Sequence, residues 1–328
     1  MFPDCDSLLT IEHGAFKMPI HGGAYHWFHQ SIQGNSGGYG IDGLRDTYFW
    51  YLNVDPQVEL ESGRTVGAHL ELRLRETDRF RAFVPGQVWP WEAYGFLKDD
   101  DWGTVKAGLL YKQFGIFWDG VFFGNAPYFD GMKLDADYGV SWEQTHEVTD
   151  CFKVDSYMQF FFHEDGSNGS FPGADPESLS GYTERNTGVA RIVPTWTTSN
   201  GATIATGVSA LVGQIDSKRV GLPDETVSAY AVDATYTRGP WKLFVEGSQR
   251  FGLFHPNNYV SGGPSDRVTN MLTGVHYTHG AVTYRASYSN SITANPGATQ
   301  NMVVAGTTIA VTKHVDLYVE YVAERVDG

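Results

Sequence analysis

The sequence predicts an all-β protein, an antiparallel barrel of about sixteen strands that crosses a membrane with its strands. Three observations support this prediction. Residue types alternate with period two along much of the chain, short turns alternate with long polar segments, and aromatic residues gather near the ends of the predicted strands. No run of about 18 apolar residues occurs, which excludes a membrane-spanning helix even though 41% of the residues are hydrophobic.

The alternation separates two faces, because successive side chains of a strand point to opposite sides of the sheet. It is complete over residues 66–75 and recurs at 241–248, 282–288 and 316–321. We expect one phase to face lipid or a neighbouring subunit: Val66, Leu70, Leu72, Leu74, Leu243, Val245, Val282, Tyr284, Leu317 and Val319. We expect the other phase to face the interior of the barrel: Arg73, Arg75, Lys242, Glu246, Arg285 and Glu320.

Tight turns are predicted where Gly, Asn or Asp interrupts the alternation, as hairpins require. They fall at 62–65, 99–103, 146–149, 199–202, 238–240, 279–281 and 313–315. Long polar segments lie between them, which is the pattern of short periplasmic turns and long external loops. The seven turns join fourteen strands, and one further strand near 22–29 makes about fifteen. Because the chain stops after a strand-like run, we expect a last strand to be missing.

A water-soluble antiparallel sandwich or propeller is the alternative, since such folds also alternate and also carry hairpin turns. Two features favour the membrane barrel. The apolar phase carries small and aromatic residues spread evenly over the strands, as lipid contact tolerates. Aromatic residues also stand at strand ends, where interfacial girdles are expected, among them Trp50, Trp91, Trp142, Trp196 and Tyr277.

Charge and cysteine content narrow the function classes. A formal charge of -15 disfavours nucleic-acid binding, which needs clustered Lys and Arg. Cys5 and Cys151 lack CxxC spacing, and a disulfide and two separate thiols both remain open. Both cysteines should lie at the periplasmic end of the barrel. The first seven residues have neither the basic start nor the apolar stretch of a secretion signal, so we expect a mature form or a fragment.

Catalytic and metal-binding patterns are weak. His21, His26 and His29 are close in sequence, but on a strand His26 and His29 point to opposite faces. No Gly-x-Ser-x-Gly motif occurs. We therefore expect no metal, no cofactor and no enzyme activity.

One segment resembles a known family. Residues 93–115, AYGFLKDDDWGTVKAGLLYKQFG, carry an aromatic–Gly pair, a turn, a Gly-Thr followed by a hydrophobic residue, and a Gly in the next strand. This pattern resembles the fourth and fifth strands of Gram-negative general diffusion porins, and Phe114-Gly115 after Lys112 is similar to the phosphate-selective porins. The resemblance implies one barrel domain over 1–328, a place in the bacterial outer membrane, a homotrimer, and a third external loop at 115–135 that folds inward and narrows the pore.

Charged residues of the inner phase give candidate pore-lining groups. A basic strip is predicted on neighbouring strands: Arg73, Arg75, Lys98, Lys106 and Lys112. In the porins that the chain resembles, such a strip faces acidic residues of the inward loop, which here would be Asp119 and Asp130, with Asp135 at the loop end. The alternative is that Arg73 and Arg75 pair with Glu71, Glu92 or Glu59 across strands.

Pattern and resemblance together predict a passive diffusion channel for small hydrophilic solutes. Outer-membrane lipid and the solutes would be its partners. Two other functions stay open at this point: a porin selective for an anion or a sugar, and a non-conducting barrel for binding or adhesion. The aromatic residues of 115–135 also have two possible roles: they could stack on sugars, as in a sugar-selective porin, or anchor the loop to the barrel wall.

Overall fold

The computed structural model describes residues 9–30, 44–76, 88–116, 136–163, 182–217, 225–254, 265–294 and 298–327. Over these ranges the chain forms seventeen β-strands joined in one sheet. In the same ranges no helix is long and apolar enough to cross a membrane.

The strands follow one another through the chain. They are β1 (Leu9–His13), β2 (Phe16–Gln30), β3 (Leu44–Val54), β4 (Gln57–Glu59), β5 (Thr65–Glu76), β6 (Val88–Asp99), β7 (Gly103–Tyr111), β8 (Ala136–Thr149), β9 (Phe152–His163), β10 (Tyr182–Thr197), β11 (Thr203–Ser217), β12 (Glu225–Arg238), β13 (Trp241–Phe254), β14 (Ser265–His279), β15 (Val282–Thr293), β16 (Ala298–Thr312) and β17 (Val315–Asp327).

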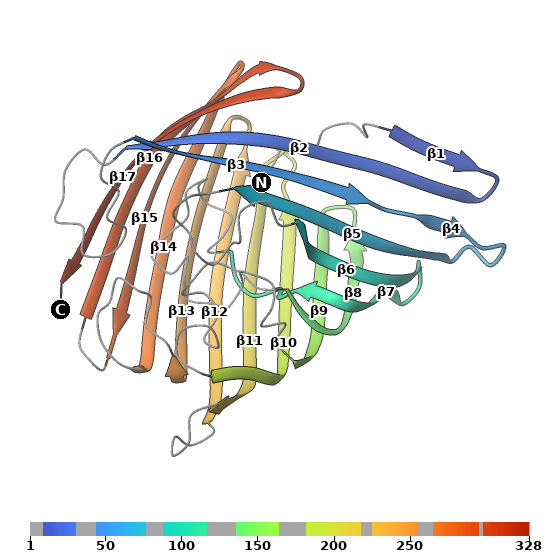
Figure 1. The fold of residues 1–328 in the computed structure, drawn as a ribbon, viewed down its shortest axis with the longest axis horizontal. Helices are drawn as coiled ribbons and strands as arrows, with labels where there is room; N and C mark the ends of the chain where they lie inside the picture. The colour runs from blue at the N-terminus through green and yellow to red at the C-terminus, as the bar shows by residue number, and fades with distance from the viewer. Residues whose placement is uncertain are drawn as a thin grey trace.

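Antiparallel ladders connect the strands in chain order. From β5 to β17 each strand pairs with the one that follows it. Figure 1 shows this sheet curving strongly, so that β2, β3 and β5 lie at a steep angle to β13–β16. Strands that tilt and curve in this way form the wall of a β-barrel, which confirms the predicted fold class.

The first strands explain the strand count. β3 and β4 act as one interrupted strand, because both pair with β2 on one side and with β5 on the other. The break falls at Asp55 and Pro56, and proline lacks the N–H that a ladder needs. With β3 and β4 taken together, β2 to β17 give the predicted fifteen strands among the described residues. β1 was not predicted; it forms a hairpin with β2 around Gly14, whose φ is 60°.

One predicted turn was wrong. Residues 146–149 continue β8, and the chain reverses at Asp150 and Cys151 instead. The ladder with β9 runs on to the pair Thr149 and Phe152, past a register shift that leaves the exposed Val148 without a ladder partner. The hydroxyl of Thr149 then accepts a hydrogen bond from the backbone N–H of Cys151 and closes the turn. The other six predicted turns lie between strands.

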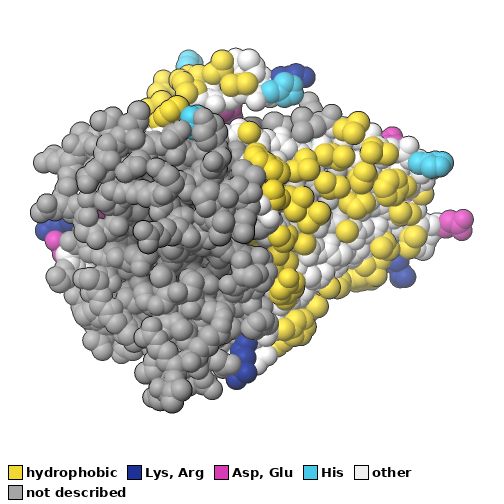
Figure 2. Space-filling model, viewed as in Figure 1, with side chains coloured by type: hydrophobic (Ala, Val, Ile, Leu, Met, Phe, Trp, Pro, Cys, Tyr) yellow, Lys and Arg dark blue, Asp and Glu magenta, His cyan; other side chains and the backbone are white. Residues whose placement is uncertain are grey.

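The two faces are as predicted for the side chains that the structure describes, and the side chain of Leu74 lies outside them. Val66, Leu243, Val245, Tyr284, Leu317 and Val319 are exposed on the outside, whereas Leu70, Leu72 and Val282 are partly buried. Figure 2 shows hydrophobic side chains predominating on the described part of the visible face, with charged residues at its edges. On the inner phase of β13, Glu246 is only 1% exposed, beside outward Val245 at 45%. The inner wall is largely polar, with buried residues that include Ser141, Gln159, Thr187, Arg191, Ser209, Asp233, Ser248, Asn270 and Ser289.

Candidate functional site

The segment that follows β7 leaves the sheet and contacts the inner wall. Lys112 is 1% exposed, and its Nζ forms an ion pair with the Asp137 carboxylate of β8 at 2.6 Å. The backbone N–H of Gln113 donates to Oε1 of Gln159 on β9 at 2.7 Å. Nε2 of Gln159 in turn donates to the carbonyl oxygen of Tyr111 at 2.9 Å. The chain after β7 is therefore attached to the two strands that follow it.

The next residues reach strands much further along the sheet. The backbone N–H of Gly115 donates to the Ser209 hydroxyl of β11 at 3.1 Å. The backbone N–H of Ile116 donates to the Glu246 carboxylate of β13. Gly115 has a φ of 61°, and a Cβ at this position would collide with the Glu246 carboxylate. Within residues 112–116 the segment thus crosses from β8 to β13 over the inner face.

The inner wall carries buried charged residues where segment 112–116 contacts it. Asp233 of β12 and Glu246 of β13 are cross-strand partners, and both are almost fully buried. Arg191 of β10 donates to both carboxylate oxygens of Asp233, at 2.6 and 2.9 Å, and to Ser209 at 2.7 Å. A buried carboxylate is costly unless it accepts hydrogen bonds. The Ile116 amide supplies one of them to Glu246, so the segment and the wall stabilise each other.

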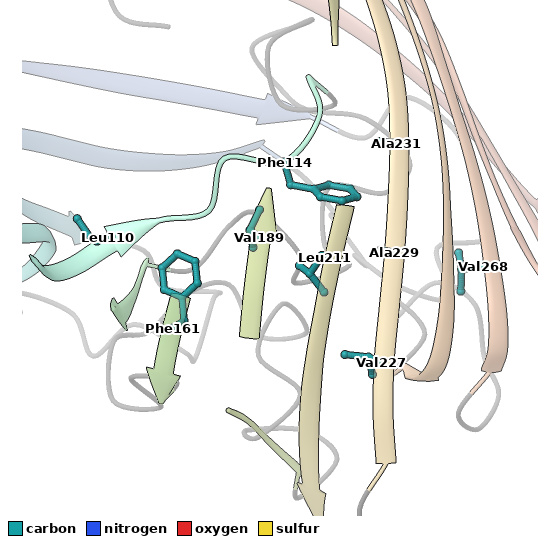
Figure 3. Close-up of a cluster of buried hydrophobic side chains, with 9 residues drawn as sticks. All are labelled: Leu110, Phe114, Phe161, Val189, Leu211, Val227, Ala229, Ala231 and Val268. Atoms are coloured by element: carbon teal, nitrogen blue, oxygen red, sulfur yellow. The ribbon is translucent and has the colours of Figure 1, made fainter. Parts of the chain in front are cut away.

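An apolar cluster anchors the same segment. Phe114 is 5% exposed and packs among residues that point inward from several strands, as Figure 3 shows. The cluster comprises Leu110, Phe114, Phe161, Val189, Leu211, Val227, Ala229, Ala231 and Val268. Burying a phenylalanine side chain contributes about 1.5–3 kcal/mol. The start of the predicted inward loop is therefore pinned by an aromatic residue, while the aromatic residues of 117–135 lie outside the described residues.

The predicted basic strip is divided among several environments. Arg73 donates to Glu71, two residues away on its own strand, and its guanidinium carbon lies 3.6 Å from the centre of the Trp91 ring. Lys106 pairs with Glu143 at 2.8 Å. Lys98 is exposed near the end of β6.

For the remaining candidate residues the structure does not describe the side chains. Arg75 faces Phe49 in the ladder, and its side chain lies outside what is described. Asp119, Asp130 and Asp135 also lie outside the described residues. The expected opposition of charges across the pore therefore stays a prediction.

Some important residues were not recognised in the sequence. Ser209 was not singled out, and Glu246 was assigned only to the inner face. Asp137, the partner of Lys112, carried no signal beyond its alternation phase. The glycine after Gln113-Phe114 was the one local sign of a sharp change in direction, and the positive φ of Gly115 shows what that glycine provides.

Cys151 lies in the turn between β8 and β9, where it is exposed and has no disulfide partner among the described residues. Cys5 lies outside the described residues. The possible disulfide therefore stays untested, although the position of Cys151 at a short-turn end of the barrel agrees with the sequence analysis.

A curved antiparallel sheet with an apolar outer face, a polar inner face and a segment bonded to the inner wall defines the class of transmembrane β-barrels. Solved structures of the same fold are outer-membrane channels. OmpF of Salmonella typhi, in a complex with daunomycin, aligns with a TM-score of 0.65 at 14% identity, over 96% of this chain and 92% of that one.

Two further solved structures give the same picture. The outer-membrane channel DcaP of Acinetobacter baumannii aligns with a TM-score of 0.65 at 15% identity, over 94% of this chain and 91% of its own. An anion-selective porin from Comamonas acidovorans aligns with a TM-score of 0.61 at 13% identity, over 95% of this chain and 88% of its own. No protein-family model matches the sequence, and no curated protein resembles it in sequence. The chain therefore has the porin fold.

Proposed function

We propose that this protein is a passive diffusion channel for small hydrophilic solutes in the bacterial outer membrane. The observation that supports it best is the segment 112–116, which enters the barrel and bonds to the inner wall at β8, β9, β11 and β13. A barrel with a polar inner face and a segment anchored to that face has the layout expected of a size-limited aqueous pore. The porin fold of the solved neighbours agrees with this proposal.

Selectivity would come from charges at the narrowest section. We propose that 115–135 forms the constriction and that Asp119 or Asp130 lies opposite Arg73 or Arg75, two of the three cations expected there. Opposed charges interact more strongly across a confined gap than in open water. Lys112 has another role in this proposal, because it is fully buried against Asp137 and attaches the segment to the wall.

Single-channel recording in planar bilayers tests the proposal. A diffusion pore gives stepwise conductance, and a pore selective for an anion or a sugar is additionally blocked by its solute. A barrel for adhesion gives no steps, and that result would refute the channel function. We also propose a homotrimer, which sedimentation of the protein in detergent would measure.

Reversal potentials in a salt gradient test the selectivity residues. Replacing Arg73 and Arg75 by Gln should shift the pore toward cations, because Glu71 then loses its Arg73 partner. Replacing Asp119 and Asp130 by Asn should shift it toward anions. Arg325→Gln is the control, since it removes one cation at an exposed position of β17. If neither pair of substitutions changes the reversal potential more than the control does, the constriction lies elsewhere.

A further inference from the structure

Three potential metal ligands converge on the inner wall at β5 and β6. One ligand atom each from His69, Glu71 and Glu92 lies within 4.8 Å of the other two, and all three residues are partly buried. Glu71 and Glu92 are direct cross-strand partners, and His69 precedes Glu71 by two residues on the same face. We infer that these residues bind a divalent transition-metal ion of the Zn²⁺ type. The inference does not depend on the proposed channel function.

The imidazole is oriented as a metal ligand would be. Nδ1 of His69 lies 2.5 Å from Oδ1 of Asp55, at the break between β3 and β4. The ring also stacks on Tyr94, with 5.0 Å between the ring centres. A carboxylate bound to one ring nitrogen fixes the ring and its tautomer, and leaves the other nitrogen for a metal. Asp55 is therefore a positioning residue for this site.

The charges around the cluster favour a bound cation. Like charges directly opposite each other destabilise a ladder, and Glu71 and Glu92 are such a pair. Arg73 bonds to Glu71, while nearby Lys106 pairs with Glu143. Among the described residues, Glu92 accepts one hydrogen bond, from the backbone N–H of Tyr111 at 3.2 Å. A divalent ion between the two carboxylates would relieve their repulsion.

A neighbouring amide gives independent support. Asn53 of β3 is the cross-strand partner of Glu71 on the side away from Glu92. Within the described part of the chain, its Oδ1 is buried and has no hydrogen-bond partner. Seven buried polar atoms of the described residues lack a hydrogen-bond partner, and Asn53 is the one whose ladder partner, Glu71, belongs to the cluster. A metal ion with a bound water beside Glu71 would supply the missing partner.

The ligand types select the metal. One imidazole with two carboxylates suits Zn²⁺, Co²⁺ or Mn²⁺, whereas Ca²⁺ and Mg²⁺ prefer oxygen ligands alone. From the sequence we expected no metal site, and His21, His26 and His29 were the ligands considered. Among the described residues the one convergent group lies on β5 and β6 instead. His69 and Glu71 are two residues apart, so the sequence alone places them on one face of a strand. Glu92 belongs to another strand, and only the ladder brings it to them.

Titration of the folded, metal-stripped protein in detergent with ZnCl₂, followed by calorimetry, tests the site. We expect about one Zn²⁺ per chain. Glu92→Gln and His69→Gln should each weaken binding at least about tenfold, and Asp55→Asn should weaken it about 10–100-fold through the orientation of His69. Glu324→Gln is the matched control, because it removes a carboxylate of β17 that accepts a hydrogen bond from Gln300 and does not belong to the cluster. It should leave Zn²⁺ binding unchanged.

A second measurement covers variants that fold poorly. Zn²⁺ should raise the unfolding temperature of the unmodified protein and not that of Glu92→Gln, because a ligand stabilises only the state that binds it. An equal concentration of CaCl₂ should not displace Zn²⁺. The inference is overturned if the unmodified protein shows no saturable Zn²⁺ binding, if Glu324→Gln loses as much affinity as Glu92→Gln, or if Ca²⁺ displaces Zn²⁺.

Discussion

Substitution of Gly115 by Ala should release the inward segment from the wall while the barrel stays folded. Gly115 has a φ of 61°, and the added methyl group would meet the Glu246 carboxylate that accepts the Ile116 N–H. The substitution therefore strains the backbone and breaks the contact to β13 at the same time. Neither effect involves a ladder hydrogen bond, so the sheet itself keeps its pairing.

The size of the effect follows from these two contacts. A left-handed φ costs an L-residue about 1–2 kcal/mol. A hydrogen bond to a charged carboxylate contributes about 1.5–3 kcal/mol. Together the attached state should lose about 2.5–5 kcal/mol, which is a factor of about 60 or more in the equilibrium between attached and released segment.

Single-channel conductance measures this release. Gly115→Ala should give larger and noisier conductance steps than the unmodified protein. The matched control is Gly247→Ala, next to Glu246 on β13, where an added Cβ meets nothing within 4 Å. Equal conductance for both variants and the unmodified protein would show that the contacts of Gly115 and Ile116 do not hold a constriction.

Three further outcomes are expected. Lys112→Met should lower the free energy of unfolding by about 3–5 kcal/mol, because it leaves Asp137 buried without its cation. The double substitution Lys112→Met with Asp137→Leu should restore much of that loss. Denaturant titration measures the free energy of unfolding of both variants. Val232→Arg on the outer face of β12 should destabilise the protein in lipid vesicles by about 2–4 kcal/mol, whereas Asn200→Arg in a short turn should not. After reduction and removal of the reductant, Cys151 should react with a maleimide in the folded protein, and resistance until unfolding would contradict its exposed position.

Much of the architecture could be predicted from local pattern. The period of two placed Val245 outside and Glu246 inside, because backbone geometry alone sends successive side chains to opposite faces. Turn chemistry placed the reversals near Gly239 and Gly280, where hairpins need a positive φ. The prediction failed at 146–149, where polar residues suggested a turn but the ladder with β9 continues to Thr149.

The candidate site was predictable only in outline. The position of 115–135 after β7 suggested an inward loop, and the contacts of Gly115 and Ile116 agree with that direction. The partner of Arg73 was among the alternatives considered, but Glu71 lies on the same strand and not across the ladder. Local sequence could not choose between these pairings, because side chains two residues apart and side chains on adjacent strands lie at similar distances.

The sequence by itself determined which residues face lipid and which face the interior, because successive side chains of a strand alternate between its two faces. Only the tertiary structure decided which interior residues meet. Gly115 contacts Ser209 at a separation of 94 residues, and Ile116 contacts Glu246 at 130. Glu92 meets His69 and Glu71 through a ladder whose register shifts at Glu71 and Leu72. Such contacts depend on strand register and on the curvature of the whole sheet, and no local stretch of sequence specifies either.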